Sequence, residues 1–365
     1  MNTAPMIRLA GVSKSYDAVT ALYPVDLDVA RGEFLTLLGP SGSGKTTLLN
    51  LIAGMISPSE GRIHIDGKDV TSTAPSKRNL GMVFQNYALL PHMTIFENVA
   101  YPLRIRKNSE ADIRTKVGRV LELMQLGHVA KRYPRELSGG QQQRISLARC
   151  IVYDPALILM DEPLGALDKK LREQMQLEIK RLHLQLGTTI LYVTHDQEEA
   201  LSMSDRIVLL NHGRIVQSAA PAELYFRPRS LFAATFLGAS NILGVTEVAG
   251  SEAVLTAGGR IRVGDRLPLP TQPGVKAMVR PESMALLAPG EANAHPNELA
   301  GTLTLSAILG GVTHHHVGLA DGGTAMVQEL TRAGRAMPAP GSAVRLAWAA
   351  EDTVLLPDDA EATSH

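Results

Sequence analysis

The sequence predicts an α/β fold with a mostly parallel sheet, followed by a small all-β domain that we expect to be barrel-like. Two observations lead to this prediction. Short apolar runs alternate with stretches of helical spacing through the first two-thirds of the chain, as in a parallel sheet covered by helices on both faces. Beyond about residue 240, short β-type runs are separated by Gly, Pro, Asn and Asp, which is typical of an all-β module.

The charge distribution supports a boundary between two domains. The 365 residues carry 36 basic and 36 acidic side chains, which argues against a nucleic-acid-binding protein because such proteins show a basic excess. Residues 1–237 carry 28 basic and 23 acidic side chains, whereas residues 238–365 carry 8 and 13. We therefore expect one domain over 1–237 and a second over 238–365.

The composition indicates a folded protein without a targeting segment of its own. Apolar residues make up 45% of the chain, enough for a sizeable core. The start of the chain has no basic region followed by an apolar stretch, so no signal peptide is expected. No apolar run approaches the ~18 residues of a membrane span, so we expect any membrane role to come through a partner. The single cysteine, Cys150, suits a reducing cytoplasm and is expected to be a buried, inert thiol.

The predicted elements follow the chain in the order strand, loop and helix. Residues 6–38 form short strands that end in a buried apolar run, and a glycine-rich loop at 39–44 leads into a helix over 46–55. Further strands are expected at 157–160, 189–193 and 207–210, with helices at 139–152, 169–186 and 196–203. Residues 86–130 lack a strand run, so we expect an inserted helical subdomain over about 86–155. The second domain has β-type runs at 274–279, 303–309 and 343–348.

The glycine-rich loop matches the phosphate-loop pattern G-x-x-x-x-G-K-S/T. In such a loop, backbone amides and the positive end of the following helix face the phosphates. Lys45 is expected to reach the β- and γ-phosphates of a nucleotide, and the Thr46 hydroxyl can bind Mg²⁺. A glycine-rich turn with an incidental lysine is the structural alternative, which the strand before and the helix after disfavour. The expected phosphate-binding residues are Gly39, Pro40, Ser41, Gly42, Ser43, Gly44, Lys45, Thr46 and Thr47.

Two acids follow the apolar strand at 157–160. Asp161 stands where a strand end can hold Mg²⁺, directly or through water. Glu162 is placed to polarise an attacking water as a general base. Acids at strand ends are common, but downstream of a phosphate loop they indicate ATP or GTP hydrolysis.

The motif Leu137-Ser138-Gly139-Gly140-Gln141 separates one class from the other phosphate-loop enzymes. It resembles the LSGGQ signature of the ABC ATPase family. Ser138 with Gln141 also has the form of a capping box at a helix start, and both interpretations hold together because a capped helix end with free amides can face an anion.

The resemblance to ABC ATPases extends from Tyr16 to His195 and implies roles for four further residues. Tyr16 is similar to the aromatic residue that stacks on adenine. Gln85 is similar to the glutamine that contacts Mg²⁺ and water. Asp168 is similar to the aspartate of the D-loop, although Gly165 stands where the family more often has Ser. His195 is similar to the switch histidine that holds the γ-phosphate.

The same resemblance implies the mechanism and the partners. Two copies would face head to tail, so that Ser138 and Gly140 of one copy close on ATP held by the other. The chain would lie on the cytoplasmic face of the membrane, bound to transmembrane permease subunits and served indirectly by an extracytoplasmic substrate-binding protein. The apolar side chains expected to form a groove for a permease helix are Tyr87, Leu89, Leu90, Met93 and Phe96.

The C-terminal region resembles the TOBE-type extension of importer ATPases. The matching segments are 236–241, 279–282 and 309–313. They look most similar to ATPases of the spermidine/putrescine type and of the related iron(III) type, so the implied substrate is a polyamine or similar small solute, with iron(III) as the alternative. His314 and His316 would share one face of a strand, and without a third ligand we expect a solvated face rather than a metal site.

Three other functions compete with a transporter subunit. A soluble ABC-type ATPase of DNA repair or translation would have long coiled-coil insertions or two ATPase units, whereas this chain has one phosphate loop and no long heptad run. A phosphate-loop kinase acting on a small molecule would need no LSGGQ motif. A third alternative makes the C-terminal domain the working part, a binding module with ATP as its regulator.

Overall fold

The computed structural model describes residues 4–264, 274–334 and 337–358. Contacts divide the chain into two compact units, Met1–Pro221 and Ala222–His365, and each is described by itself. This division falls after the first residue of the short helix α7 (Pro221–Phe226) and before α8 (Leu231–Phe236), and a domain boundary near residue 237 stays a prediction.

The first unit is built on a six-stranded sheet in the order β10-β9-β3-β8-β7-β6. Neighbouring strands are parallel except for β10, which pairs antiparallel with β9, so the predicted mostly parallel sheet is confirmed. The strands are β3 (Phe34–Leu38), β6 (Gly81–Val83), β7 (Leu157–Asp161), β8 (Thr189–Thr194), β9 (Arg206–Asn211) and β10 (Arg214–Ala219).

Strand β7 shows why its sequence is a continuous apolar run. Ile158 and Met160 belong to one buried cluster, together with residues of the inserted helices, whereas Leu157 and Leu159 belong to a second cluster, together with the phosphate-loop helix. Alternate side chains of a strand point to opposite faces, so a sheet covered on both faces needs apolar residues at every position.

A separate antiparallel sheet, in the order β2-β1-β4-β5, packs into the second cluster beside α1 (Lys45–Ala53). Its strands are β1 (Ile7–Tyr16), β2 (Val19–Val29), β4 (Glu60–Ile65) and β5 (Lys68–Asp69). The sequence predicted strands over 6–38, but β4 and β5 were not foreseen because their residues are mostly exposed and polar.

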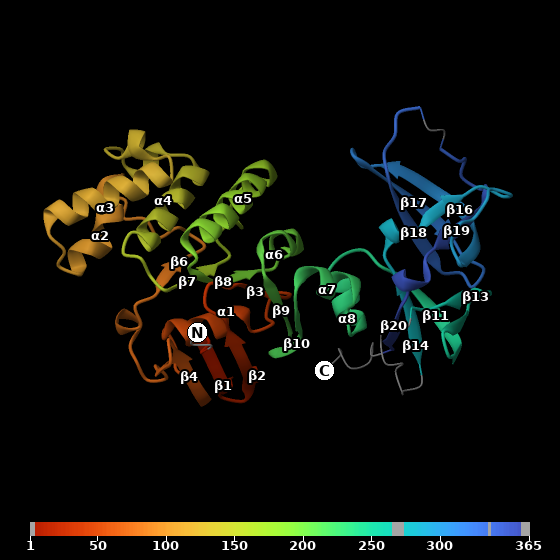
Figure 1. Cartoon of the computed structure of the whole chain (residues 1–365), viewed down its shortest axis with the longest axis horizontal. Coiled ribbons are helices and arrows are strands. Elements are labelled where there is room, and N and C mark those ends of the chain that lie inside the picture. Colours follow the sequence, from red (N-terminus) through yellow and green to blue (C-terminus); the bar gives the residue numbers. More distant parts are fainter. Residues whose placement is uncertain (1–3, 265–273, 335–336, 359–365) are drawn as a thin grey trace. The chain divides into compact units, whose positions relative to one another are not determined.

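Helices α2 (Ile95–Ile105), α3 (Glu110–Leu123) and α4 (Gly139–Ile151) lie within the segment predicted to be helical. Each begins at a residue whose side chain accepts a hydrogen bond from the first turn, Thr94, Ser109 and Ser138. Figure 1 shows these helices gathered at one end of the first unit and the β1–β2–β4 sheet at the other. The unit also contains α5 (Lys169–Leu186), α6 (Gln197–Met203) and short 3₁₀ turns at Pro75–Lys77, Gly127–Val129 and Pro134–Glu136.

The second unit contains two five-stranded antiparallel sheets around one core, as the prediction of an all-β domain requires. One sheet has the order β13-β12-β11-β14-β20, with β11 (Asn241–Ala249), β12 (Glu252–Leu255), β13 (Arg260–Arg262), β14 (Val275–Val279) and β20 (Val354–Pro357). The other has the order β15-β19-β16-β17-β18, with β15 (Ala285–Leu287), β16 (Asn297–Ile308), β17 (Val312–Gly318), β18 (Thr324–Leu330) and β19 (Ala343–Trp348). Short 3₁₀ turns lie at Pro281–Ser283 and Ala350–Asp352.

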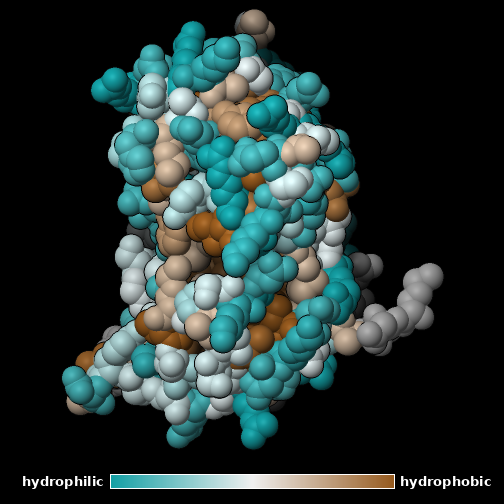
Figure 2. Space-filling view, turned by 90° about the vertical axis from the view of Figure 1, so that its left-hand side faces the viewer, coloured by the Kyte–Doolittle hydropathy of each residue, from teal (hydrophilic) through white to brown (hydrophobic). Residues whose placement is uncertain are grey.

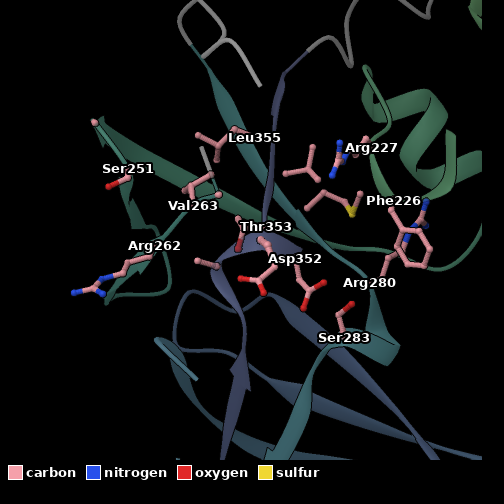
Figure 3. Close-up of a pocket in the computed structure, with 16 residues that line it drawn as sticks. Phe226, Arg227, Ser251, Arg262, Val263, Arg280, Ser283, Asp352, Thr353 and Leu355 are labelled. Carbon is pink, nitrogen blue, oxygen red and sulfur yellow. The ribbon is translucent and has the colours of Figure 1, made fainter. Parts of the chain in front are cut away.

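Arg280, which follows β14, is a buried cation in the second unit. Its guanidinium donates to the carbonyl oxygens of Tyr225, Ala234 and Ala239 at 2.6–3.1 Å and lies over the Tyr225 ring. Arg280 lines a cavity of about 980 Å³, to which Asp352 and Leu355 also contribute. Figure 3 shows these three among the lining residues. The guanidinium therefore ties the segment that contains α7 and α8 to the sheet.

The histidine run 314–316 on β17 and the single cysteine both make hydrogen bonds within the protein. His315 is buried, with Nδ1 at 2.7 Å from the Ser306 hydroxyl, and His314 bonds Gln328; among the residues described, no group of three His, Cys, Asp or Glu side chains is placed to hold a metal. Cys150 is buried and its thiol donates to the Met82 carbonyl, and burial raises its pKa to about 11. Within the described ranges, no helix has the length and apolar character needed to span a membrane.

Candidate nucleotide-binding site

The phosphate loop lies between β3 and α1, and its glycines are required by the backbone. A Cβ on Gly39 would stand 2.2 Å from the Leu210 carbonyl oxygen. Gly42 and Gly44 have φ angles of 79° and 96°, in the left-handed region that favours glycine. Gly44 is the N-cap of α1 and provides no side-chain acceptor, so the amides at the helix start are left for an anion.

Lys45 is folded back onto the loop. Its Nζ donates to the carbonyl oxygens of Gly39 and Pro40, both at 2.8 Å, and only 5% of the residue is exposed. Burial lowers the pKa of Lys45, and the nearby carboxylates of Glu162 and Asp161 oppose that shift. Since these hydrogen bonds are to neutral carbonyls, a phosphate entering the loop offers the ammonium a stronger, charge-assisted partner.

Asp161 is the last residue of β7 and faces the start of α1. Its Oδ1 accepts a hydrogen bond of 3.5 Å from the Thr46 hydroxyl. Burial raises the pKa of Asp161, and the charge of Glu162 adds to that shift, whereas Thr46 and Lys45 oppose it. A carboxylate held beside a hydroxyl in this way is ready to receive a cation.

Glu162 and His195 meet at the same edge of the sheet. Glu162 Oε1 lies 3.1 Å from His195 Nδ1, and the Glu162 amide donates to the Val193 carbonyl at 3.0 Å. Parallel strands present their carboxyl ends at one edge, so β7 and β8 carry these two side chains to neighbouring positions. His195 is 58% exposed and Glu162 23%, which leaves both open to a ligand from solvent.

The remaining predicted residues lie at turns and helix starts around this edge. Gln85 follows β6, and its Nε2 lies 3.8 Å from where a Cβ on Gly165 would stand, so the loop has room for the serine more usual in the family. Asp168 caps α5 by accepting from the Leu171 amide at 3.0 Å. Tyr16 is half exposed at the end of β1, with Lys14 over its ring.

The signature segment starts α4 and forms the capping box that the sequence predicted. The Gln141 amide donates to the Ser138 hydroxyl at 3.4 Å, and the Ser138 amide donates to Gln141 Oε1 at 3.1 Å. A Cβ on Gly140 would stand 2.9 Å from the Leu171 side chain. Within the part of the chain described, no hydrogen bond joins Ser138–Gln141 to the phosphate loop, so this segment is not part of the cluster formed by Lys45, Thr46, Asp161, Glu162 and His195.

Two polar residues near the site were missed by sequence reasoning. Arg172, on α5, donates to the carbonyl of Leu167 and to the carboxylate of Asp196, which follows His195. An arginine on an amphipathic helix and an aspartate at a helix start are common surface features. Neither residue therefore stands in a sequence pattern that would mark it as part of a functional site. Only the packing of α5 against α6 brings them together.

Two family models match parts of this chain. The model of the ABC transporter family matches residues 22–165, and that of the TOBE domain matches residues 277–356. A spermidine/putrescine import ATP-binding protein of Thermobifida fusca is 45% identical, over 97% of this chain and 94% of the relative.

The chain belongs to the ABC transporter family. It is an ATP-binding, ATP-hydrolysing subunit of that family. A protein of the same name from Acidothermus cellulolyticus is 44% identical to this ABC ATPase over 95% of its chain and 93% of the relative. A dimeric post-hydrolysis structure of an ATP-binding cassette with ADP and Pi bound has 35% identity and a TM-score of 0.54, covering 59% of this chain and 99% of that one.

Proposed function

We propose that this ABC ATPase drives the import of polyamines of the spermidine/putrescine class. The supporting observation is the 45% identity to a spermidine/putrescine import ATP-binding protein, which extends over 97% of the chain and so includes the second unit as well as the ATPase unit. ATPase units alone are shared by transporters of many solutes, and the match to the C-terminal region is what favours this substrate class.

The site supports ATP hydrolysis with Mg²⁺. Mg²⁺ prefers hard oxygen donors. The site offers three of them, namely the hydroxyl of Thr46, the carboxylate of Asp161 and the amide oxygen of Gln85. When bound, the ion would neutralise charge on the phosphates. The amides of the loop and Lys45 would hold the phosphates, Glu162 would accept the proton of the attacking water, and His195, near Glu162, would contact the γ-phosphate. Tyr16 would stack on the base.

A second copy of the chain would complete the site. Ser138 and Gly139 are exposed at the start of α4, whereas Gly140 is buried. The capping box uses the amides of Ser138 and Gln141, and among the residues described the amides of Gly139 and Gly140 make no hydrogen bond. Because this segment does not join the phosphate loop of its own chain, we propose that it closes on ATP bound to the partner in a head-to-tail dimer, with Asp168 at the same interface. The dimeric cassettes among the solved structures support this arrangement.

We further propose that permease subunits bind beside the helical part of the first unit, at the cytoplasmic face of the membrane, and that a substrate-binding protein acts through them. The side chains of Tyr87, Leu89, Leu90, Met93 and Phe96 are all half-buried. Figure 2, which views the side carrying α2 and β4, shows apolar areas set among polar residues.

The substrate proposal is tested by uptake in the source organism. Deleting the gene for this chain should abolish uptake of radiolabelled spermidine or putrescine, and the wild-type gene should restore it. The Glu162→Gln gene should not. Normal polyamine uptake in the deletion strain, with loss of iron(III) uptake instead, would overturn the substrate class while leaving the ATPase assignment intact.

A further inference from the structure

We propose that Arg172 is a positioning residue for ATP hydrolysis, which holds the turn carrying His195 against the loop carrying Asp168. This inference rests on the proposed roles of Glu162 and His195. It concerns a residue outside the phosphate loop, the strand-end acids and the signature segment.

One guanidinium joins the two loops. Arg172 Nη2 donates at 3.1 Å to the carbonyl of Leu167, which is the residue directly before Asp168. Arg172 Nη1 donates at 2.9 Å to Oδ2 of Asp196, which is the residue directly after His195. The fork of a guanidinium can make both bonds at fixed relative angles, which a lysine ammonium cannot.

Asp196 is itself held in place by the chain around it. Its Oδ1 accepts from the amides of Glu198 and Glu199 at 2.8 and 3.2 Å, capping α6, and its own amide donates to Thr194 at 3.0 Å. Its second carboxylate oxygen is therefore directed to Arg172. The His195 turn is fixed from two sides, by α6 and by α5.

A buried carboxylate continues this network below the turn. Glu199 is 2% exposed, and its Oε2 accepts from the hydroxyls of Tyr192 and Thr194, both at 2.8 Å. Glu199 Oε1 lies 3.9 Å from Arg172 Nε, too far for a hydrogen bond, and the buried Nε has no hydrogen-bond partner among the residues that the structure describes. Such an unused donor costs free energy.

Arg172 would act through His195, the residue before Asp196, because His195 Nδ1 lies 3.1 Å from Glu162 Oε1.

The first test separates turnover from nucleotide binding. Arg172→Met should lower kcat for ATP hydrolysis by about 10-fold to 100-fold, because small misplacements of catalytic groups have effects of that size. The Kd for MgATP, measured by calorimetric titration, should change less than about 3-fold, because the phosphate loop is untouched. Asp196→Asn keeps the oxygen that caps α6 and should lower kcat less. The double variant should be no slower than Arg172→Met, since both changes break one contact.

Chemical rescue of kcat distinguishes a positioning role of Arg172 from a purely structural one. A cavity of about 350 Å³ between α5 and α6 is lined by Arg172, Glu173 and Asp196. Methylguanidinium at millimolar concentration should raise the kcat of Arg172→Ala several-fold, and methylammonium should not. Arg172→Lys should stay slow because it restores charge without the fork.

Arg144→Met is the matched control. Arg144 forms a 2.8 Å ion pair with Glu178, and their side chains are 28% and 25% exposed. The side chains of Arg172 and Asp196 are 29% and 23% exposed, so the two ion pairs are equally buried. Arg144→Met should therefore lower thermal stability about as much as Arg172→Met while leaving kcat within about 2-fold.

Two outcomes overturn the inference: an unchanged kcat in Arg172→Met, or equal kcat losses in Arg172→Met and Arg144→Met without rescue by methylguanidinium. If the wild-type protein and Glu162→Gln hydrolyse ATP equally fast, it is the proposed role of Glu162 that fails.

Discussion

At the residue scale, Glu162 combines an unusual backbone with a functional position. Its φ angle is 42°, in a region that non-glycine residues seldom occupy. The hydrogen bond from its amide to the Val193 carbonyl holds this conformation, so β8 fixes where the β7 carboxylate points. The same contact places Glu162 beside His195. The backbone, rather than side-chain freedom, thus determines the distance between the proposed base and the proposed γ-phosphate contact.

Glu162→Gln separates hydrolysis from binding. Glutamine keeps the shape of the side chain but cannot accept the proton of the attacking water, so ATP hydrolysis should slow by at least ~100-fold while MgATP binds nearly normally. Lys45→Ala should instead lose nucleotide affinity, because the loop loses its cation. A phosphate-release assay and calorimetric titration measure the two effects. Near wild-type turnover in Glu162→Gln would show that another group is the base.

Asp161→Asn should raise the Tm of the nucleotide-free protein and reduce the Tm increase that MgATP causes. Because burial raises the pKa of Asp161, the folded protein holds the proton more tightly than the unfolded chain does. The stabilisation that this provides is present at acid pH and is lost as pH rises through the folded-state pKa, so at neutral pH the ionised carboxylate disfavours folding. We therefore expect a higher Tm for the nucleotide-free variant at pH 7 and a smaller Tm increase on adding MgATP. A lower Tm without nucleotide would contradict the sign.

At the element scale, two arginines, the half-buried Arg149 and the buried Arg280, each fasten a neighbouring segment of chain. Arg149 on α4 donates to the carbonyls of Tyr87 and Ala88, two consecutive residues with positive φ, and Ser146 adds a bond of 3.0 Å to Tyr87. The loop after Gln85 is therefore fastened to the signature helix. Arg280 does the same for α7 and α8 in the second unit.

Arg280→Met should destabilise the second unit. The substitution leaves several buried carbonyl oxygens without a donor, so the free energy of unfolding should fall by at least ~2 kcal/mol. Differential scanning calorimetry should show this loss in a transition that MgATP does not shift. Arg260→Met, which removes an exposed ion pair with Glu252, is the control and should change stability by less than ~0.5 kcal/mol. Equal effects of the two variants would show that Arg280 anchors nothing.

At the scale of the whole molecule, the signature segment is separated from the nucleotide cluster of its own chain. Among the interactions described, Ser138 bonds only to residues at the start of α4, and the amides of Gly139 and Gly140 make no hydrogen bond. This separation is why we propose that a second copy of the chain completes the site in a symmetric pair. Closing on ATP would then couple nucleotide binding to association, and hydrolysis would release the pair.

Ser138→Arg tests the pairing. In the Glu162→Gln background, ATP should produce a dimer by light scattering and ADP a monomer. Adding Ser138→Arg should abolish the ATP dimer, because the larger side chain fills the space that the γ-phosphate needs. MgATP affinity of the monomer should be retained, as Ser138 lies apart from Lys45. A persistent dimer in the double variant, with or without membrane subunits present, would refute the shared site.

Most of the fold could be predicted because its signals are local. The strand at β7 and the helix at α5 appear directly in the sequence as an apolar run and as a period of 3.6. The exposed strand β4 has no such signal, since its pairing with β1 depends on a distant segment. The half-buried charge of Arg172 and the buried charges of Glu199 and Arg280 likewise had no signal in the sequence, because charged residues are usually at the surface and their burial depends on partners elsewhere in the chain.

The sequence by itself determined the phosphate loop, the acids after β7, the signature at α4 and the change to an all-β domain, because each is a pattern of neighbouring residues with its own backbone or chemical requirement. Only the tertiary structure decided that Glu162 meets His195, that Lys45 folds onto its own loop and that Arg172 joins the turns beside Asp168 and His195. Those contacts depend on which strands pair and how α5 packs on α6. Such long-range pairings depend on the burial of the whole core rather than on any local pattern.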